Sequence, residues 1–195
     1  REGVNALGAF MGRSNSYGVA VCARQFKPVA FSNLTNVTFQ RFYRISKRTA
    51  QIRLVYVNMA PAGAPNESSA GSYTITNASA IFGWTGSGTG LSIPVTFNGG
   101  SASVNVAAYQ TVTSDPITLP WFVAEGDLIN IRNYITASGA FIPTENGSAG
   151  GVYSEGYIAS DLVSSGNTGN SFSGATQTLG FGPTMVVANT GAGVV

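Results

Sequence analysis

The chain has 195 residues, of which 44% are hydrophobic and 9% are charged, and its formal net charge is +2. The apolar share is sufficient for the core of one full domain, which argues against a disordered chain. The sequence has no histidine and a single cysteine, which excludes histidine-based catalytic triads, histidine-bound zinc and internal disulfides.

In chain order, the expected strands are 17–23, 41–47, 51–58, 71–79, 91–98, 101–108, 110–119, 127–135, 151–159 and 183–188. Turn-forming residues lie between them, at 60–65, 83–90, 98–100 and 125–127. No segment has a convincing 3.6-residue period over a helical length. The sequence therefore predicts a protein built from β-strands throughout.

The strongest turn signal is Asn98-Gly99-Gly100, because Asn and Gly tolerate a positive φ. It predicts a hairpin that joins two expected strands. After the turn, Ala102, Val104 and Val106 are expected on one face, with the polar residues between them on the other. This is the pattern of a half-buried antiparallel strand.

Many short strands without internal repeats favour an all-β fold, an antiparallel β-sandwich or jelly roll. We expect a single sandwich domain over residues 1–180, in which residues 1–18 could form an extended N-terminal arm. Residues 181–195 are then a C-terminal strand and a linker-like tail. Because the chain starts at Arg1, we also expect a processed or excised piece of a longer product.

Charged residues are scarce against a usual share of about a quarter, and Ser, Thr, Asn and Gly take their place. A neutral polar surface of this kind is typical of extracellular β proteins and of virion proteins. We therefore expect a location outside the cell or on a virion surface. No run of about 18 apolar residues occurs, so the sequence predicts no transmembrane helix and no membrane partner.

The acidic residues do not form an obvious catalytic pair. A two-carboxylate glycosidase needs two acids roughly 5–10 Å apart in a cleft. Glu125 and Asp127 are the closest acids in the sequence, but the surrounding "VAEGDL" indicates a solvent-exposed turn before a strand. We expect a protein that is not an enzyme and that needs no cofactor or metal.

The positive charge is concentrated near the N-terminus. Residues 1–53 hold nine Lys or Arg and one acid, a net charge of +8, whereas the remainder holds one Arg and seven acids, a net charge of −6. Basic residues interleaved with aromatics can bind single-stranded nucleic acid. Alternatively, these side chains pack their stems on the sheet and pair with acids of the later half, so nucleic acid ranks last among the partners. The residues of this candidate basic patch are Arg41, Arg44, Lys47, Arg48 and Arg53.

A carbohydrate-binding site requires exposed aromatic rings beside hydrogen-bonding side chains, because sugar C–H faces stack on rings and hydroxyls need polar partners. Trp84, in a Gly-rich loop, is the leading candidate. The neighbours of Trp121, Pro120 and Phe122, favour burial, and packing in the core is the alternative for every candidate ring. The candidate glycan-binding residues are Trp84, Tyr109, Trp121, Arg132 and Tyr153.

The segment 95–135 contains a Phe-x-Gly-Gly hairpin, a Val-x-Val strand, a Ser-Asp-Pro corner and a Gly-Asp-Leu turn in this order. In these motifs it resembles the N-terminal β-sandwich accessory domain of GDSL/SGNH-type hydrolases. Ser46, Arg53 and Asn58 lie at comparable places upstream, and residues 182–195 look like the family's tether to a catalytic domain. The matching residues are Phe97, Gly99, Gly100, Val104, Val106, Ser114, Asp115, Pro116, Gly126, Asp127 and Leu128.

The resemblance implies a galactose-binding-like jelly roll. It carries over no catalytic residue, because the family's Gly-Asp-Ser and Asp-x-x-His motifs do not occur in this sequence. Such domains position a hydrolase on a polymer or cover its active site, and similar modules occur on phage tail or capsid proteins.

Two functions therefore stay open beside nucleic-acid binding. The first is a non-catalytic accessory or carbohydrate-binding module of a secreted or phage-borne hydrolase, with a polysaccharide or glycan as its partner. The second is a structural virion or surface protein, such as a capsid decoration, capsid or tail subunit. Its partners would be copies of itself or virion neighbours, because a basic first third and an acidic remainder suit head-to-tail contacts.

Overall fold

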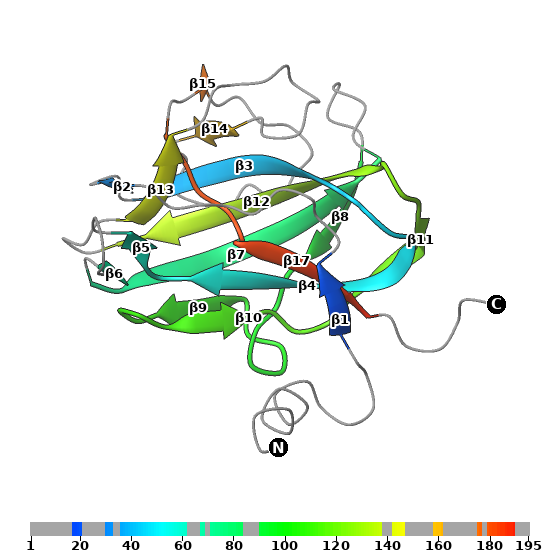
Figure 1. Ribbon diagram of the computed structural model, residues 1–195, viewed down its shortest axis with the longest axis horizontal. Coiled ribbons are helices and arrows are strands. Elements are labelled where there is room, and N and C mark those ends of the chain that lie inside the picture. Colours follow the sequence, from blue (N-terminus) through cyan, green and yellow to red (C-terminus); the bar gives the residue numbers. More distant parts are fainter. Residues whose placement is uncertain are drawn as a thin grey trace.

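The computed structural model describes residues 17–20, 30–32, 36–61, 67–68, 71–83, 90–137, 142–146, 158–161, 175–176 and 179–189. All regular structure in these residues is β-strand, and antiparallel sheets pack together as a β-sandwich, which confirms the expected fold class (Figure 1). Over the same residues, no helix has the length and apolar character needed to cross a membrane.

Two sheets form the sandwich. The five-stranded sheet contains β1 (Tyr17–Ala20), β17 (Met185–Asn189), β4 (Thr49–Val57), β10 (Thr111–Thr113) and β11 (Ile117–Val123). The seven-stranded sheet contains β15 (Ala175–Thr176), β14 (Ile158–Asp161), β3 (Val37–Arg44), β12 (Leu128–Thr136), β7 (Tyr73–Phe82), β8 (Leu91–Pro94) and β9 (Ser103–Val106). Two smaller sheets contain β16 (Leu179–Gly180), β13 (Ile142–Asn146) and β2 (Ala30–Ser32), and β5 (Ala60–Pro61) and β6 (Glu67–Ser68).

Strands β3 and β12 form the centre of the seven-stranded sheet. They pair without interruption from Val37 opposite Ile135 to Arg44 opposite Leu128. Apart from their ends, the residues of both strands are buried on both faces. Strands rich in β-branched and aromatic residues suit this position, because such side chains pack well on a pleated surface. A strand covered on both faces buries whatever residue it carries, polar or apolar.

Phe181 lies in the middle of an aromatic core between the two sheets. Its ring centroid is 5.4 Å from that of Tyr73, 5.9 Å from that of Phe39 and 6.1 Å from that of Tyr56. Burial raises the pKa of Tyr56 and the pKa of Tyr73. The neighbouring Tyr43 and Tyr73 raise the pKa of Tyr56 further. The phenols of Tyr56 and Tyr73 therefore stay uncharged at neutral pH.

The chain after Phe181 is also part of the sandwich. The Tyr43 hydroxyl donates to the Pro183 carbonyl at 2.7 Å. Strand β17 then pairs with β4, from Met185 opposite Val55 to Ala188 opposite Ile52, and its other edge pairs with β1. The C-terminal strand expected at 183–188 corresponds to β17, which is part of the five-stranded sheet.

Candidate binding surface

The predicted hairpin at 98–100 is present. Asn98, Gly99 and Gly100 have φ angles of 51°, 80° and 123°, and Phe97 pairs with Ser101 across the turn. In the strand that follows, the two valines are buried and the polar residues between them are exposed, as expected. Ala102, which we expected on the buried face, is exposed.

Asp115 fixes this hairpin to the corner between β10 and β11. Its carboxylate accepts hydrogen bonds from Gly99 N at 3.0 Å, from Gly100 N at 2.8 Å and from the Thr96 hydroxyl at 2.9 Å. Its own backbone N–H donates to Thr96 O at 2.8 Å. The carboxylate therefore caps the hairpin at 98–100, and it joins the two sheets, because the hairpin lies between β8 and β9 of the other sheet.

Replacing Asp115 by Asn is expected to lower the free energy of unfolding at pH 7 by about 1 kcal/mol, because the amide nitrogen cannot accept the hydrogen bonds of the glycines. Partial burial acts to raise the pKa of this carboxyl. The bonds from Gly99, Thr96 and Gly100 and the charge of Arg53 outweigh that effect and hold the pKa below its ordinary value of 3.8.

A folded-state pKa that is lowered stabilises the protein above the unfolded-state pKa, and this contribution is lost as the pH falls through the folded-state pKa. The stability difference between wild type and Asp115→Asn should therefore be constant from pH 7 to about pH 5 and shrink below pH 4. Urea unfolding at several pH values measures it. A difference that does not change with pH would show that the carboxylate charge has no role.

Tyr109 lies in the loop between β9 and β10. It has a φ of 60°, unusual for a bulky residue, and its side chain is 57% exposed. Its N–H donates to Asn58 O at 3.0 Å, and the buried Asn58 side chain donates to Val106 O and Ala107 O at 2.9 and 3.0 Å. The loop is therefore held in place by its backbone while the aromatic ring projects into solvent.

Trp121 and Phe122 are exposed because β11 leaves its regular pairing with β4. Thr118 pairs with Gln51 and Val123 pairs with Thr49, so four residues of β11 lie opposite Ala50. The side chains of Trp121 and Phe122 are 50% and 54% exposed, while the valine that ends the strand is buried. The burial that the neighbours of Trp121 favoured is not observed.

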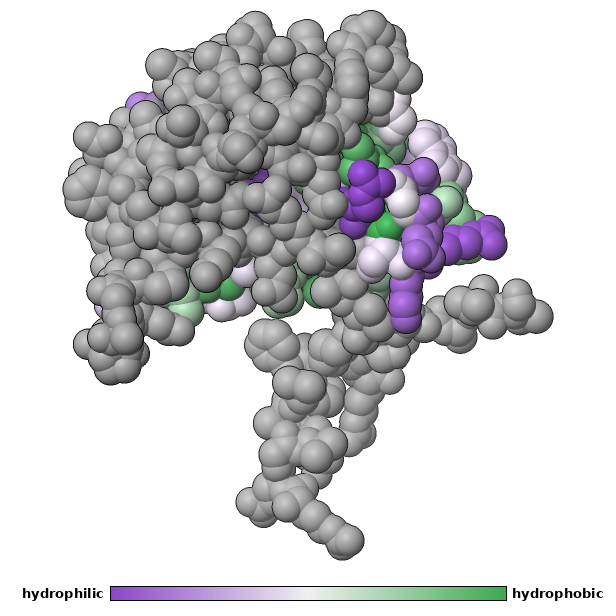
Figure 2. Space-filling view, turned by 45° about the horizontal axis from the view of Figure 1, so that its top comes forward, coloured by the Kyte–Doolittle hydropathy of each residue, from purple (hydrophilic) through white to green (hydrophobic). Residues whose placement is uncertain are grey.

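A basic side chain covers the Phe122 ring. The guanidinium carbon of Arg48 lies 4.2 Å from the centroid of the Phe122 ring, and Lys47 beside it is exposed. A cation over an aromatic face is attracted by the ring quadrupole. We call Lys47, Arg48, Trp121 and Phe122 the aromatic–basic patch. Figure 2 shows hydrophilic and hydrophobic residues side by side at the end of the molecule where β11 lies.

The turn that follows the patch carries Glu125 and Asp127, both exposed, as expected for a solvent-exposed turn. The Asp127 carboxylate accepts from Ala124 N at 2.9 Å, and Arg44 donates to Gly126 O at 2.8 Å. The two acids therefore cap and flank a turn. Across the described part of the chain, no three His, Cys, Asp or Glu side chains are grouped so that they could hold a metal ion.

Two of the candidate arginines are inside the protein. Arg132 is 1% exposed, and its Nε donates to Gln40 Oε1 at 2.8 Å, an oxygen that also accepts from Asn130 at 3.0 Å. Arg41 is fully buried, with its guanidinium carbon 5.6 Å from the centroid of the Tyr43 ring. Contrary to expectation, Arg132 cannot contact a glycan at the surface and Arg41 is not part of an exposed basic patch.

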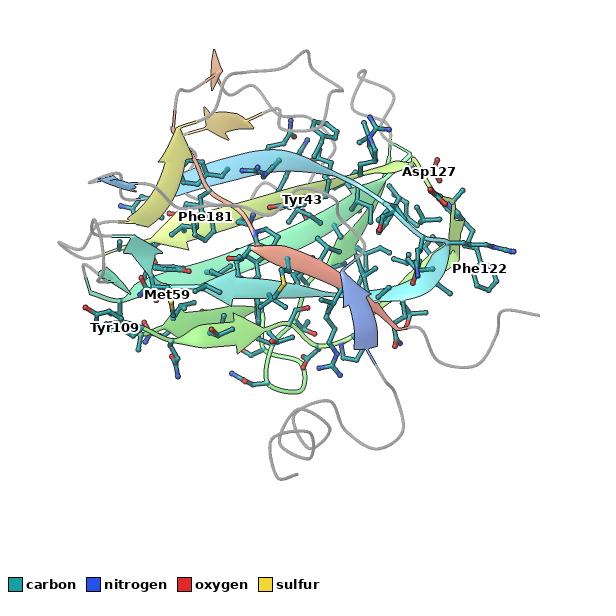
Figure 3. The ribbon with its side chains drawn as sticks, viewed as in Figure 1. Tyr43, Met59, Tyr109, Phe122, Asp127 and Phe181 are labelled. Carbon is teal, nitrogen blue, oxygen red and sulfur yellow. The ribbon has the colours of Figure 1, made fainter. Side chains whose placement is uncertain are left out.

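The structure thus brings only some of the predicted residues together. Trp121 joins the exposed part of the basic segment, Arg44, Lys47 and Arg48, whereas Arg53 is half-buried near the Asp115 corner, where it donates to Ser114 O at 3.5 Å. Tyr109 lies at the opposite end of the molecule from Phe122 and Asp127 (Figure 3). Trp84 and Tyr153 lie outside the described residues.

Phe122 was not among the predicted site residues. Its signal in the sequence is the run Pro120-Trp121-Phe122, in which two large aromatic residues follow a proline that cannot donate to a sheet. No protein-family model matches the chain, and a search of the curated proteins finds no similar sequence. Fold and site together define an all-β sandwich with an aromatic–basic patch at one end.

Proposed function

We propose that the protein is a non-catalytic accessory module of a secreted or phage-borne hydrolase and that it binds a polysaccharide through the aromatic–basic patch. One observation carries the proposal: two adjacent large rings are half exposed on a strand whose two ends are regularly paired. An exposed aromatic ring contributes less to folding stability than a buried ring does. The C–H faces of sugars, in contrast, stack on exposed rings of this kind.

The framework of the patch supports binding with little loss of conformational freedom. Leu119 and Val123 are buried on either side of the exposed residues, so β11 is anchored at both ends of its excursion. The connection between β3 and β4 is tied to the neighbouring turn by hydrogen bonds from Ile45 N to Asp127 O and from Gly126 N to Ile45 O. Rings held in position before binding lose less entropy on contact with a ligand.

We expect the chain to be retained by at least one member of a panel of neutral and acidic polysaccharides, measured by affinity electrophoresis. Trp121→Ala should weaken that binding by about tenfold, the loss of about 1.4 kcal/mol that corresponds to one aromatic stacking contact. Tyr109→Ala is the matched control, since it removes an equally exposed ring at the other end of the molecule, and it should leave binding unchanged. Retention by no polysaccharide, or equal retention of the Trp121 variant, would contradict the proposal.

The second candidate function is a structural virion or surface subunit. The same two exposed rings favour it, because aromatic residues are enriched at the centre of protein interfaces. Sedimentation of the chain at high concentration separates the two functions. A stable oligomer that Trp121→Ala dissociates supports the structural role, and a monomer that binds polysaccharide supports the module.

A further inference from the structure

The aromatic–basic patch combines a ring for stacking with a cation, and this combination indicates the class of ligand. The inference rests on the proposed function. We propose that the patch binds an acidic polysaccharide, one whose sugars carry carboxylate groups. Arg48 covers one face of Phe122, with 4.2 Å between the guanidinium carbon and the ring centroid. Trp121, the preceding residue of β11, is half exposed and is the ring proposed to stack on a sugar.

A polysaccharide that stacks on Trp121 would extend toward the Arg48 guanidinium, which lies over the ring of the next residue. A guanidinium can lie over a ring and still donate hydrogen bonds from its edge, because its five N–H groups lie in its plane. That planar fork matches the two oxygens of a carboxylate. A neutral sugar would use the ring and leave the charge without a ligand partner, whereas a uronic acid would use the ring and Arg48 together.

Arg48 is also held at the correct end of the molecule. It follows Ile45 in the β3–β4 connection, and that residue exchanges backbone hydrogen bonds of 2.7 and 2.8 Å with the turn at 124–127. The Arg44 side chain donates to the same turn at 2.8 Å. The basic residues of the patch therefore do not depend on a mobile loop for their position next to β11.

The distribution of charge favours an acidic polysaccharide over a polynucleotide. A protein that binds single-stranded nucleic acid needs a basic groove that follows the phosphates, with rings for successive bases. Here Arg41 and Arg132 are buried, so among the described residues the exposed basic side chains at this end are Arg44, Lys47 and Arg48. Three exposed cations at one end do not form such a groove, whereas one ring beside one guanidinium suits a single uronic acid unit.

The test is affinity electrophoresis of the full chain through gels that contain sodium alginate, a polyuronate, or dextran, which is neutral, with a chelator present. Alginate should retard the wild type more than dextran does. Arg48→Gln should weaken alginate binding by about tenfold and lower the slope of log affinity against log salt concentration by about one. Arg48→Lys keeps the positive charge, so it should retain the salt slope. It lacks the planar guanidinium, so it should lose affinity.

Arg48 is exposed, so all variants should melt at the wild-type temperature, and a melting curve of each variant checks that the fold is intact. Equal retardation by alginate and dextran, lost in Trp121→Ala, would overturn the acidic ligand while leaving the polysaccharide module in place. Unchanged alginate binding of Arg48→Gln would overturn it as well. Tighter binding to poly(dT) than to alginate, measured by fluorescence anisotropy, would overturn it in favour of a nucleic acid.

Discussion

Replacing Phe181 by Ala is expected to lower the free energy of unfolding by about 3–5 kcal/mol. The ring is 1% exposed and lies within aromatic contact of Phe39, Tyr56 and Tyr73. Its neighbours come from both sheets, which hydrogen bonds hold in place, so the cavity cannot close. Because natural domains are stable by about 5–15 kcal/mol in total, this single change removes a large part of the stability.

Urea unfolding followed by far-ultraviolet circular dichroism measures the loss. Phe122→Ala is the matched control: it removes the same side chain from a position that is 54% exposed, and its cost should stay below about 1 kcal/mol. Equal effects of the two substitutions would mean that the Phe181 ring does not lie in the core between the two sheets.

Replacing Gly182 by Ala is expected to destabilise the protein by about 2–4 kcal/mol, through overpacking and the loss of a buried hydrogen bond. A methyl group at this position would lie 2.3 Å from the Tyr43 hydroxyl oxygen and 3.2 Å from Arg41 Cδ. The tyrosine cannot simply turn aside, because its hydroxyl is buried and bonded to Pro183 O. Relief of the clash requires the ring or the C-terminal segment to move.

A double-mutant cycle tests this cause. Tyr43→Phe alone should cost about 1–2 kcal/mol, since it leaves the Pro183 carbonyl without its donor. In the double variant the clashing oxygen is gone, so Gly182→Ala should cost clearly less in the Tyr43→Phe background than in the wild type. Strictly additive effects, measured by the same unfolding curves, would place the damage elsewhere.

Local signals predicted most of the strands and the main turns. Residues 51–58, 71–79 and 127–135 correspond to β4, β7 and β12 within a few residues. The hairpin at 98–100 could be anticipated because glycine and asparagine tolerate its backbone angles, and the corner at 114–116 because Asp-Pro marks a turn. Each of these features depends on residues that are close together in the chain.

The burial of charged and aromatic side chains could not be predicted in the same way. Arg132 is buried because β12 is covered on both faces, and its partner Gln40 lies on a strand distant in sequence. Trp121 is exposed because β11 departs from β4 after Thr118, and an irregular register leaves no periodic trace in the sequence. Surface position in this protein is a property of sheet pairing rather than of residue type.

The excursion of β11 also makes the patch a natural place for engineering. Regular pairing resumes at Val123, and the buried Leu119 secures the other end, so the residues between them can change without disturbing either sheet. A library of substitutions at 120–122 should keep the wild-type fold while changing what the surface recognises. New ligand specificities could then be selected from one scaffold, much as they are from the loops of an antibody.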